Sequence, residues 1–143
     1  MGKYFTIKEL TYSATAKRKG INNTPDEVTI SHLEELIEVL DKIREAWGSP
    51  IIVSSGYRCE RLNKVLGGAK YSAHKYGYAV DLEPRNGKNK EFLKFLERWL
   101  LDNNQPWDQL INEHPIDGIP AWIHFGLRNK DGKQRRQMFT ISK

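Results

Sequence analysis

The stretch YSAHKYGYAVDLEP, residues 71–84, places two potential metal ligands at the junction of a loop and a strand. Period-two alternation from Tyr78 to Glu83 predicts a β-strand whose apolar face meets the core and whose other face carries Asp81. His74 lies in the preceding loop, where Gly77 would allow the chain to turn back towards the strand. The stretch therefore predicts that an imidazole and a carboxylate approach one point.

A second alternating segment, WIHFGL at residues 122–127, places His124 opposite a set of apolar residues. If the two strands pair, His124 and Asp81 point into one groove that His74 can reach. Two imidazoles and one carboxylate with an open fourth position are the ligands of a catalytic zinc, which acidifies bound water and polarises a carbonyl. Ala79 is small and leaves room for an ion. From spacing alone, the alternative of a surface or hydrogen-bonded histidine stays open.

The remaining pattern predicts an α+β domain, in which helices pack on a small antiparallel sheet. Apolar residues at helical spacing predict a long helix that Thr29 or Ser31 caps and that ends at Trp47, before Gly48 and Pro50. The other expected elements are a buried strand at 51–53, a helix at 60–66, a helix at 90–101 and a strand at 107–113.

The length of 143 residues favours one domain covering residues 1–143. The chain contains no apolar run long enough for a membrane helix, and MGKYFTIKEL lacks the apolar core of a signal peptide. We therefore expect a protein that is cytoplasmic as made. Cys59 is the only cysteine, which excludes an internal disulfide and a thiolate zinc cluster. A metal site must then use histidines and carboxylates.

The net charge of +5 favours anionic partners such as nucleic acid, anionic lipid or an acidic cell-wall polymer. The most basic cluster, NKDGKQRRQ at residues 129–137, is interpreted as a solvated turn. Charge alone would also fit a nucleic-acid-binding domain, which predicts salt-sensitive DNA binding.

Three segments of the chain resemble the zinc D-alanyl-D-alanine peptidases of bacterial cell-wall metabolism and their phage endolysin relatives. They are SSGYRCERLNKVLGGAKYSAHKYGYAVDLEP, WDQLINE and WIHFGLR. The family signature S-x-H-x(2)-G-x-A-x-D is matched by Ser72, His74, Gly77, Ala79 and Asp81, and a later W-x-H by Trp122 and His124. The similarity runs from about residue 33 to residue 127.

This resemblance implies a hedgehog-like α+β fold and a zinc ion bound by His74, Asp81 and His124. It implies a metallopeptidase that hydrolyses bonds at D-amino acids in peptidoglycan stem peptides, as a D,D-carboxypeptidase or an endopeptidase. The expected partner is the stem peptide, with no specific nucleic acid and no membrane, and the expected state is a monomer. Such a protein would act on the cell wall once released, as in phage or prophage lysis.

The residue that deprotonates the attacking water is less directly implied. In the better-known branches an acidic residue lies three positions before the last zinc histidine, but here that position is Ala121. A branch of small, phage-like members has a D-Q-L-I-x-E segment upstream, and this match makes Glu113 the candidate general base. Asp117 is a weaker alternative. His114 lies beside Glu113 and does not match the family pattern.

Two more residues are candidates for contact with the substrate. Arg58 follows a predicted strand at a turn, where it could pair with a substrate carboxylate or stabilise the oxyanion in catalysis. A structural salt bridge is the alternative for Arg58. Ser72 could hydrogen-bond substrate or only cap the turn. Because position 121 is an alanine, the alternative function is a zinc-containing wall-binding module without turnover.

Overall fold

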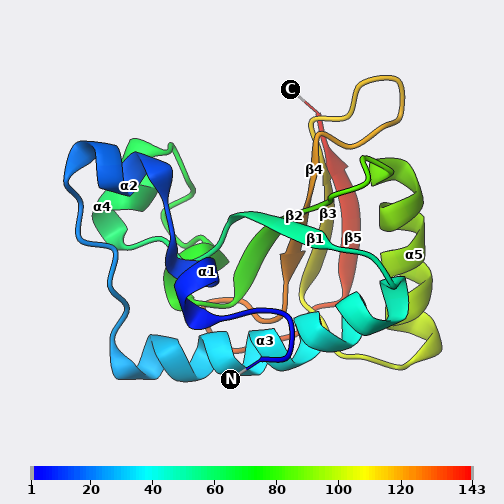
Figure 1. Ribbon diagram of the computed structural model, residues 1–143, viewed down its shortest axis with the longest axis horizontal. Coiled ribbons are helices and arrows are strands. Elements are labelled where there is room, and N and C mark those ends of the chain that lie inside the picture. Colours follow the sequence, from blue (N-terminus) through cyan, green and yellow to red (C-terminus); the bar gives the residue numbers. More distant parts are fainter. Residues whose placement is uncertain (1, 143) are drawn as a thin grey trace.

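The computed structural model describes residues 2–142. Its five strands form one sheet in the order β1-β2-β4-β3-β5 (Figure 1). The strands are β1 (Ile51–Ser55), β2 (Ala79–Pro84), β3 (Gln109–Glu113), β4 (Trp122–Gly126) and β5 (Gln137–Ile141). The pairs β1–β2, β2–β4 and β3–β4 are antiparallel, whereas β3–β5 is parallel. The predicted α+β class is confirmed, but the sheet is mixed rather than wholly antiparallel.

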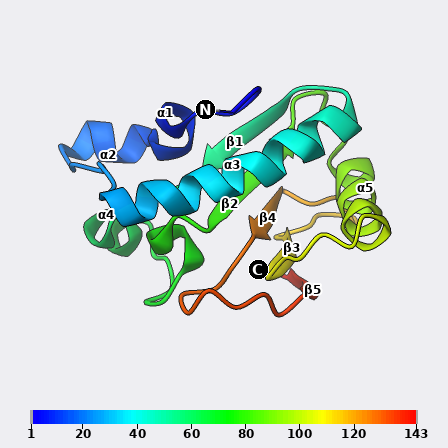
Figure 2. The same ribbon diagram turned by 90° about the horizontal axis from the view of Figure 1, so that it is seen from below.

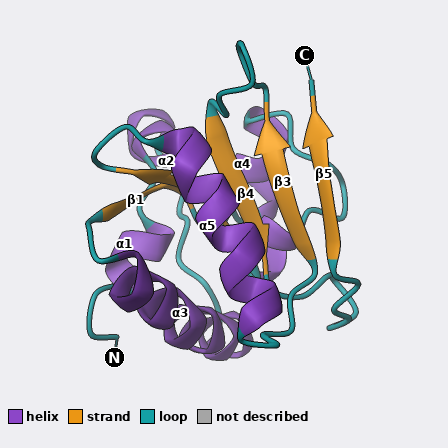
Figure 3. Cartoon of the chain, turned by 90° about the vertical axis from the view of Figure 1, so that its right-hand side faces the viewer, coloured by secondary structure: helices purple, strands orange, loops and turns teal. Residues whose placement is uncertain are grey.

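Helices cover one face of this sheet and flank one of its ends. They are α1 (Ile7–Thr11), α2 (Ala14–Lys19), α3 (Glu27–Trp47), α4 (Glu60–Val65) and α5 (Asn89–Asp102), with a 3₁₀ turn η1 (Ala73–Tyr76) before β2. Figures 2 and 3 show α3 and α5 along the same side of the sheet. No helix within residues 2–142 combines the length and the apolar character that membrane crossing requires.

The long helix α3 supplies much of the core. Its buried residues recur at helical spacing as predicted, and they pack with the inward-facing residues of β2 and β4. This set comprises Leu33, Leu36, Ile37, Leu40, Ile43, Val80, Leu82, Ile123 and Phe125. Full burial of one such aliphatic side chain contributes about 1.5–3 kcal/mol. The alternation predicted for residues 78–83 and 122–127 is therefore confirmed, since the other face of each strand is left for polar groups.

The start of α3 differs from the prediction. Asp26 is the N-cap, and its carboxylate accepts a hydrogen bond from the Thr29 backbone amide at 2.8 Å. Ser31 lies inside the helix, where its hydroxyl donates to the Val28 carbonyl at 2.6 Å. The caps expected at Thr29 or Ser31 are wrong because a carboxylate three residues before Thr29 already satisfies a free amide of the first turn. The predicted end is confirmed by Gly48, which is left-handed with φ +78°.

The strand expected at 51–53 exists, but it is only half buried. β1 lies at the edge of the sheet, and Ile52 is 42% exposed. A run of three β-branched residues reads as buried on both faces, but an edge strand with one covered face exposes every second residue. The helices expected at 60–66 and 90–101 and the strand expected at 107–113 are present within two residues of their predicted bounds.

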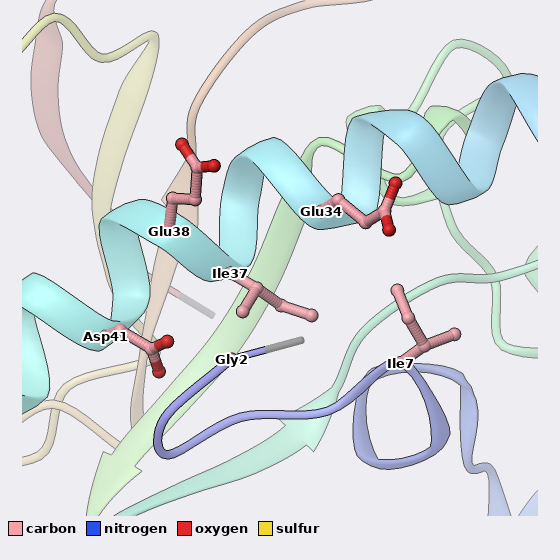
Figure 4. A pocket seen from close by; sticks show the side chains of 6 residues that line it. All are labelled: Gly2, Ile7, Glu34, Ile37, Glu38 and Asp41. Carbon is pink, nitrogen blue, oxygen red and sulfur yellow. The ribbon is translucent and has the colours of Figure 1, made fainter.

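The N-terminal segment passes beside α3 and leads into α1, as Figure 4 shows. The Asp41 carboxylate accepts hydrogen bonds from the backbone amides of Lys3, Tyr4 and Phe5 at 2.7, 3.0 and 3.2 Å. Gly2 lies so close to α3 that an added Cβ would come within 2.4 Å of Ile37 Cγ2. One carboxylate of α3 thus fixes the path of residues 2–5 across the helix.

The turn that carries His74 depends on a glycine. Gly77 ends η1 in the left-handed region with φ +74°, and a Cβ there would lie 2.9 Å from the Thr29 carbonyl oxygen of α3. The Gly77 amide bonds back to the carbonyls of Ala73 and His74. The turn predicted from Gly77 is therefore confirmed, and it places η1 directly against the start of α3.

We predict that Gly77→Ala lowers the free energy of unfolding by about 2 kcal/mol or more, because the left-handed backbone alone costs about 1–2 kcal/mol and the Thr29 contact adds to it. Gly87→Ala is the matched control, since Gly87 has φ +78° and open space around it. The control should lower the free energy of unfolding only by the cost of the left-handed backbone. Urea unfolding of both variants is the measurement. An equal decrease in the two variants would contradict a role for the close approach of Gly77 to α3.

Candidate metal centre

The ladder between β2 and β4 brings two of the predicted ligands together. Asp81 of β2 and His124 of β4 are directly opposite each other in the antiparallel register. The residues on either side of them in each strand belong to the apolar core. Because side chains alternate along a strand, Asp81 and His124 both project to the face that the helices leave open. The side-by-side pairing that the sequence analysis required for one shared groove is present.

The third predicted ligand comes from η1. His74 was expected in a loop, and it lies in a 3₁₀ turn that Ser72 caps by accepting a hydrogen bond from the His74 amide at 3.2 Å. The His74 carbonyl in turn accepts from the Arg58 amide at 3.1 Å. These two hydrogen bonds fix η1 beside the β1–α4 connection and direct the His74 imidazole towards β2.

The three side chains converge on one point. Asp81 Oδ1 lies 3.4 Å from His74 Nε2 and 3.2 Å from His124 Nδ1. Each residue offers one ligand atom, and these atoms all lie within 4.8 Å of one another. All three side chains are buried, with 3–8% of each residue exposed. Within residues 2–142, this is the one group of three such residues close enough to share a metal ion.

The hydrogen-bonding pattern of His74 shows why a cation fits this point. His74 Nδ1 lies 2.8 Å from the Gly56 carbonyl oxygen, so Nδ1 carries the proton and donates it. Burial lowers the pKa of His74, which favours the neutral ring. In that ring Nε2 is an acceptor, yet it faces an acceptor oxygen of Asp81. A shared cation would satisfy both lone pairs, and these donors suit zinc.

Asp81 is held as an anion. Burial would raise the pKa of its carboxyl, but the adjacent imidazoles of His124 and His74 outweigh burial and hold that pKa well below its usual range. The Arg58 guanidinium lies 3.5 Å from Asp81 Oδ2, and its Nε donates to Ser55 Oγ at 3.1 Å. Arg58 therefore lies beside the three candidate ligands and contacts one of them, Asp81.

The metal centre forms part of the floor of a cleft of about 520 Å³. The lining includes the six residues that the sequence favoured for metal, substrate or catalysis, namely Arg58, Ser72, His74, Asp81, Glu113 and His124. The sequence thus predicted which residues gather, although the lining alone assigns no role to any of them.

Glu113 occupies the same open face as the metal centre. In the β3–β4 ladder Ile111 is opposite His124, and Glu113, two residues further on, is opposite Trp122. The Glu113 side chain is only 14% exposed, and burial raises the pKa of its carboxyl. The Ala121 amide donates to the Glu113 backbone carbonyl at 3.0 Å, so these two residues are neighbours at the end of the β3–β4 ladder.

The weaker alternatives lie elsewhere. Asp117 is exposed in a turn with φ +53°, away from the cleft lining described for residues 2–142. His114 Nε2 approaches Glu113 Oε1 only at 3.9 Å, and His114 does not belong to the group that could share a metal ion. These positions favour Glu113 over Asp117 as the carboxylate of the cleft.

Sequence reasoning missed two charged residues of the cleft, Asp108 and Arg135. Arg135 was part of the basic segment interpreted as a solvated turn. Its Nε and Nη2 donate to the two carboxylate oxygens of Asp108, both at 2.8 Å. Asp108 and Arg135 are 27 positions apart, so no local sequence pattern predicts that they pair. The one signal for Arg135 was its place in a basic run directly before a segment with strand propensity.

The family model described as Peptidase M15 matches residues 3–114. The chain belongs to this family. M15 peptidases are zinc-dependent hydrolases that act on peptidoglycan, which agrees with a His-Asp-His group able to bind a metal ion. The matched region contains Arg58, His74, Asp81 and Glu113 and ends before His124. No curated protein matches the chain.

We predict that His124→Ala weakens zinc binding on the order of 100-fold or more, because the loss of a ligand should exceed the effect of losing an outer partner. Zinc content after dialysis against a metal buffer is the measurement. His114→Asn is the matched control, since asparagine tolerates the left-handed backbone at this position, where φ is +47°. Equal zinc retention by the two variants would contradict the assignment.

Proposed function

We propose that this M15 family member is a zinc metallopeptidase that hydrolyses peptide bonds next to D-amino acids in peptidoglycan stem peptides. The observation that carries the proposal is a buried His-Asp-His group at the floor of an open cleft, with an acidic and a basic side chain beside it. The cut is either a carboxypeptidase cut at the terminal D-alanine or an endopeptidase cut within the stem or cross-bridge.

In this proposal His74, Asp81 and His124 hold the zinc ion. Bound zinc would supply a Lewis acid that polarises the scissile carbonyl and lowers the pKa of water. The ligands are well suited to this task because the Gly56 carbonyl fixes the tautomer of His74, and the ladder fixes the position of His124 against Asp81. Little reorganisation is then needed when the ion binds.

Glu113 acts as the general base in this proposal. Its carboxylate takes a proton from the attacking water as the new carbon–oxygen bond forms, and it returns that proton to the nitrogen as the carbon–nitrogen bond breaks. Burial raises the pKa of Glu113, which makes the carboxylate a stronger base than an exposed one. The position on β3, next to the strand of His124, supports the role.

Arg58 and Ser72 contribute differently. The Arg58 guanidinium is held by Ser55 and Asp81 at the edge of the centre, and its position supports a role in binding substrate or the oxyanion. The Ser72 hydroxyl accepts the amide of His74, which supports the capping alternative for its oxygen while its hydrogen remains able to reach substrate.

The setting of the activity is part of the same proposal. A net charge of +5 would favour adsorption to an anionic wall, and that attraction should weaken as salt rises. A monomer released to the wall during phage or prophage lysis would fit these properties. The competing function, a wall-binding module without turnover, draws its support from Ala121.

We predict that Glu113→Gln lowers kcat/KM on defined stem peptides by about 10²- to 10⁴-fold, the usual contribution of a general base. Zinc content should stay at the wild-type level because Glu113 is not a ligand in this proposal. Mass spectrometry of the products, together with metal analysis of the same sample, is the measurement, and it also identifies the bond that is cut.

Asp117→Asn is the matched control, since it removes an exposed carboxylate from the same region and should leave the rate unchanged. If Glu113→Gln retains full activity with full zinc, Glu113 is not the base. If the zinc-loaded wild type releases no product from stem peptides or purified peptidoglycan, the wall-binding module replaces the peptidase.

A further inference from the structure

One end of the cleft holds an arginine in a fixed position. Arg135 precedes β5, and its Nε and Nη2 form two parallel hydrogen bonds of 2.8 Å with the Asp108 carboxylate. The same carboxylate accepts the Arg135 backbone amide at 3.0 Å. The Asp108 side chain is only 2% exposed, so this carboxylate is a rigid and desolvated anchor. The guanidinium is therefore held without any contribution from a ligand.

The pair leaves part of the guanidinium available. The Arg135 side chain is 42% exposed, and both members of the pair line the cleft. Among the described residues, no protein acceptor is found for Arg135 Nη1. A guanidinium whose orientation is already fixed loses little conformational entropy when it binds a second anion. An arginine needed only as a structural anchor for β5 would not have to face the cleft.

The sheet register places Arg135 and Glu113 on opposite sides of the metal centre. Along β3, Gln109 is opposite Gly126, Ile111 is opposite His124, and Glu113 is opposite Trp122. Each step of two residues is about 7 Å. Asp108 directly precedes Gln109, so its partner Arg135 lies at the Gln109 end. An extended peptide that crosses the centre would reach Arg135 two or three residues from the scissile bond.

The charge balance of the cleft as a whole favours an anionic substrate. Its arginines and carboxylates are Arg58, Arg135, Asp81, Asp108 and Glu113, and the lining becomes net positive once a divalent ion is bound. Two lysines also lie near a lining residue, because Lys70 and Lys130 each place Nζ 5.4 Å from the ring centroid of Tyr71. Lys130 is partly neutralised by Asp131 at 3.1 Å.

We propose that Arg135 is a specificity-determining residue that binds a free carboxylate on the substrate, two or three residues from the cleaved bond. The inference rests on the proposed peptidase function and narrows its substrate class to acidic stem peptides. A carboxamide in place of that carboxylate would lose the charge-assisted hydrogen bond to the guanidinium. Arg135 lies beyond residues 3–114, the region that the family model matches.

The test measures cleavage by the zinc-loaded protein of two synthetic stem peptides that differ only in a free carboxylate or a carboxamide near the cut. We predict that the wild type prefers the acidic peptide by about tenfold or more in kcat/KM, the ratio expected for one charge-assisted hydrogen bond. Arg135→Gln should remove this preference by slowing only the acidic peptide, mainly through KM. Arg135→Lys keeps the charge and should restore part of it.

Arg136→Gln is the matched control, since it removes a neighbouring positive charge whose guanidinium lies over the Trp107 ring. It should leave the preference intact, and a loss equal to that of Arg135→Gln would show a general charge effect and overturn the inference. Equal cleavage of both peptides by the wild type would overturn the inference while the peptidase function stands. Cleavage of neither peptide, with no product from peptidoglycan, would overturn both.

Discussion

The convergence of Asp81, His74 and His124 is the constraint on which the rest of this structure depends. A buried carboxylate oxygen and two buried imidazole nitrogens within 4.8 Å of one another require a cation or protons between them. Each is held by a different part of the chain, through η1, β2 and β4. The helices pack on the opposite face of the sheet, so the apolar core and the polar centre share the same strands and differ only in the face that each uses.

The cleft distributes its other charged groups along β3. Glu113 lies on one side of the centre, and Asp108 with Arg135 lies on the other. The proposed general base and the proposed specificity residue are therefore at opposite ends of β3. Within residues 2–142, neither group contacts His74, Asp81 or His124 through a hydrogen bond. Arg58 differs, because its contact with Asp81 joins the proposed substrate binding to the electrostatics of the candidate metal centre. A change at Arg58 would therefore affect two properties at once.

Much of the site could be predicted because it is carried by local patterns. Alternation in residues 78–83 and 122–127 predicted which side chains share a face, and Gly77 predicted the turn that returns His74 to the strand. The pairing of Arg135 with Asp108 could not be predicted, because it depends on how two distant segments pack. β5 was also missed: its residues are mostly exposed, so it lacks the apolar alternation that marked β2 and β4. The parallel pairing of β3 and β5 likewise has no local signature.

The position of Asp81 directly opposite His124 makes metal binding depend on the pairing register of β2 and β4. In a strand the side chains alternate, so a slip of β4 by one residue would turn His124 to the core side and bring apolar residues to the open face. A misregistered chain could not present the complete set of donors. The bound ion would therefore select correctly paired chains, and the zinc content of a preparation would report the fraction of molecules in which β2 and β4 have aligned.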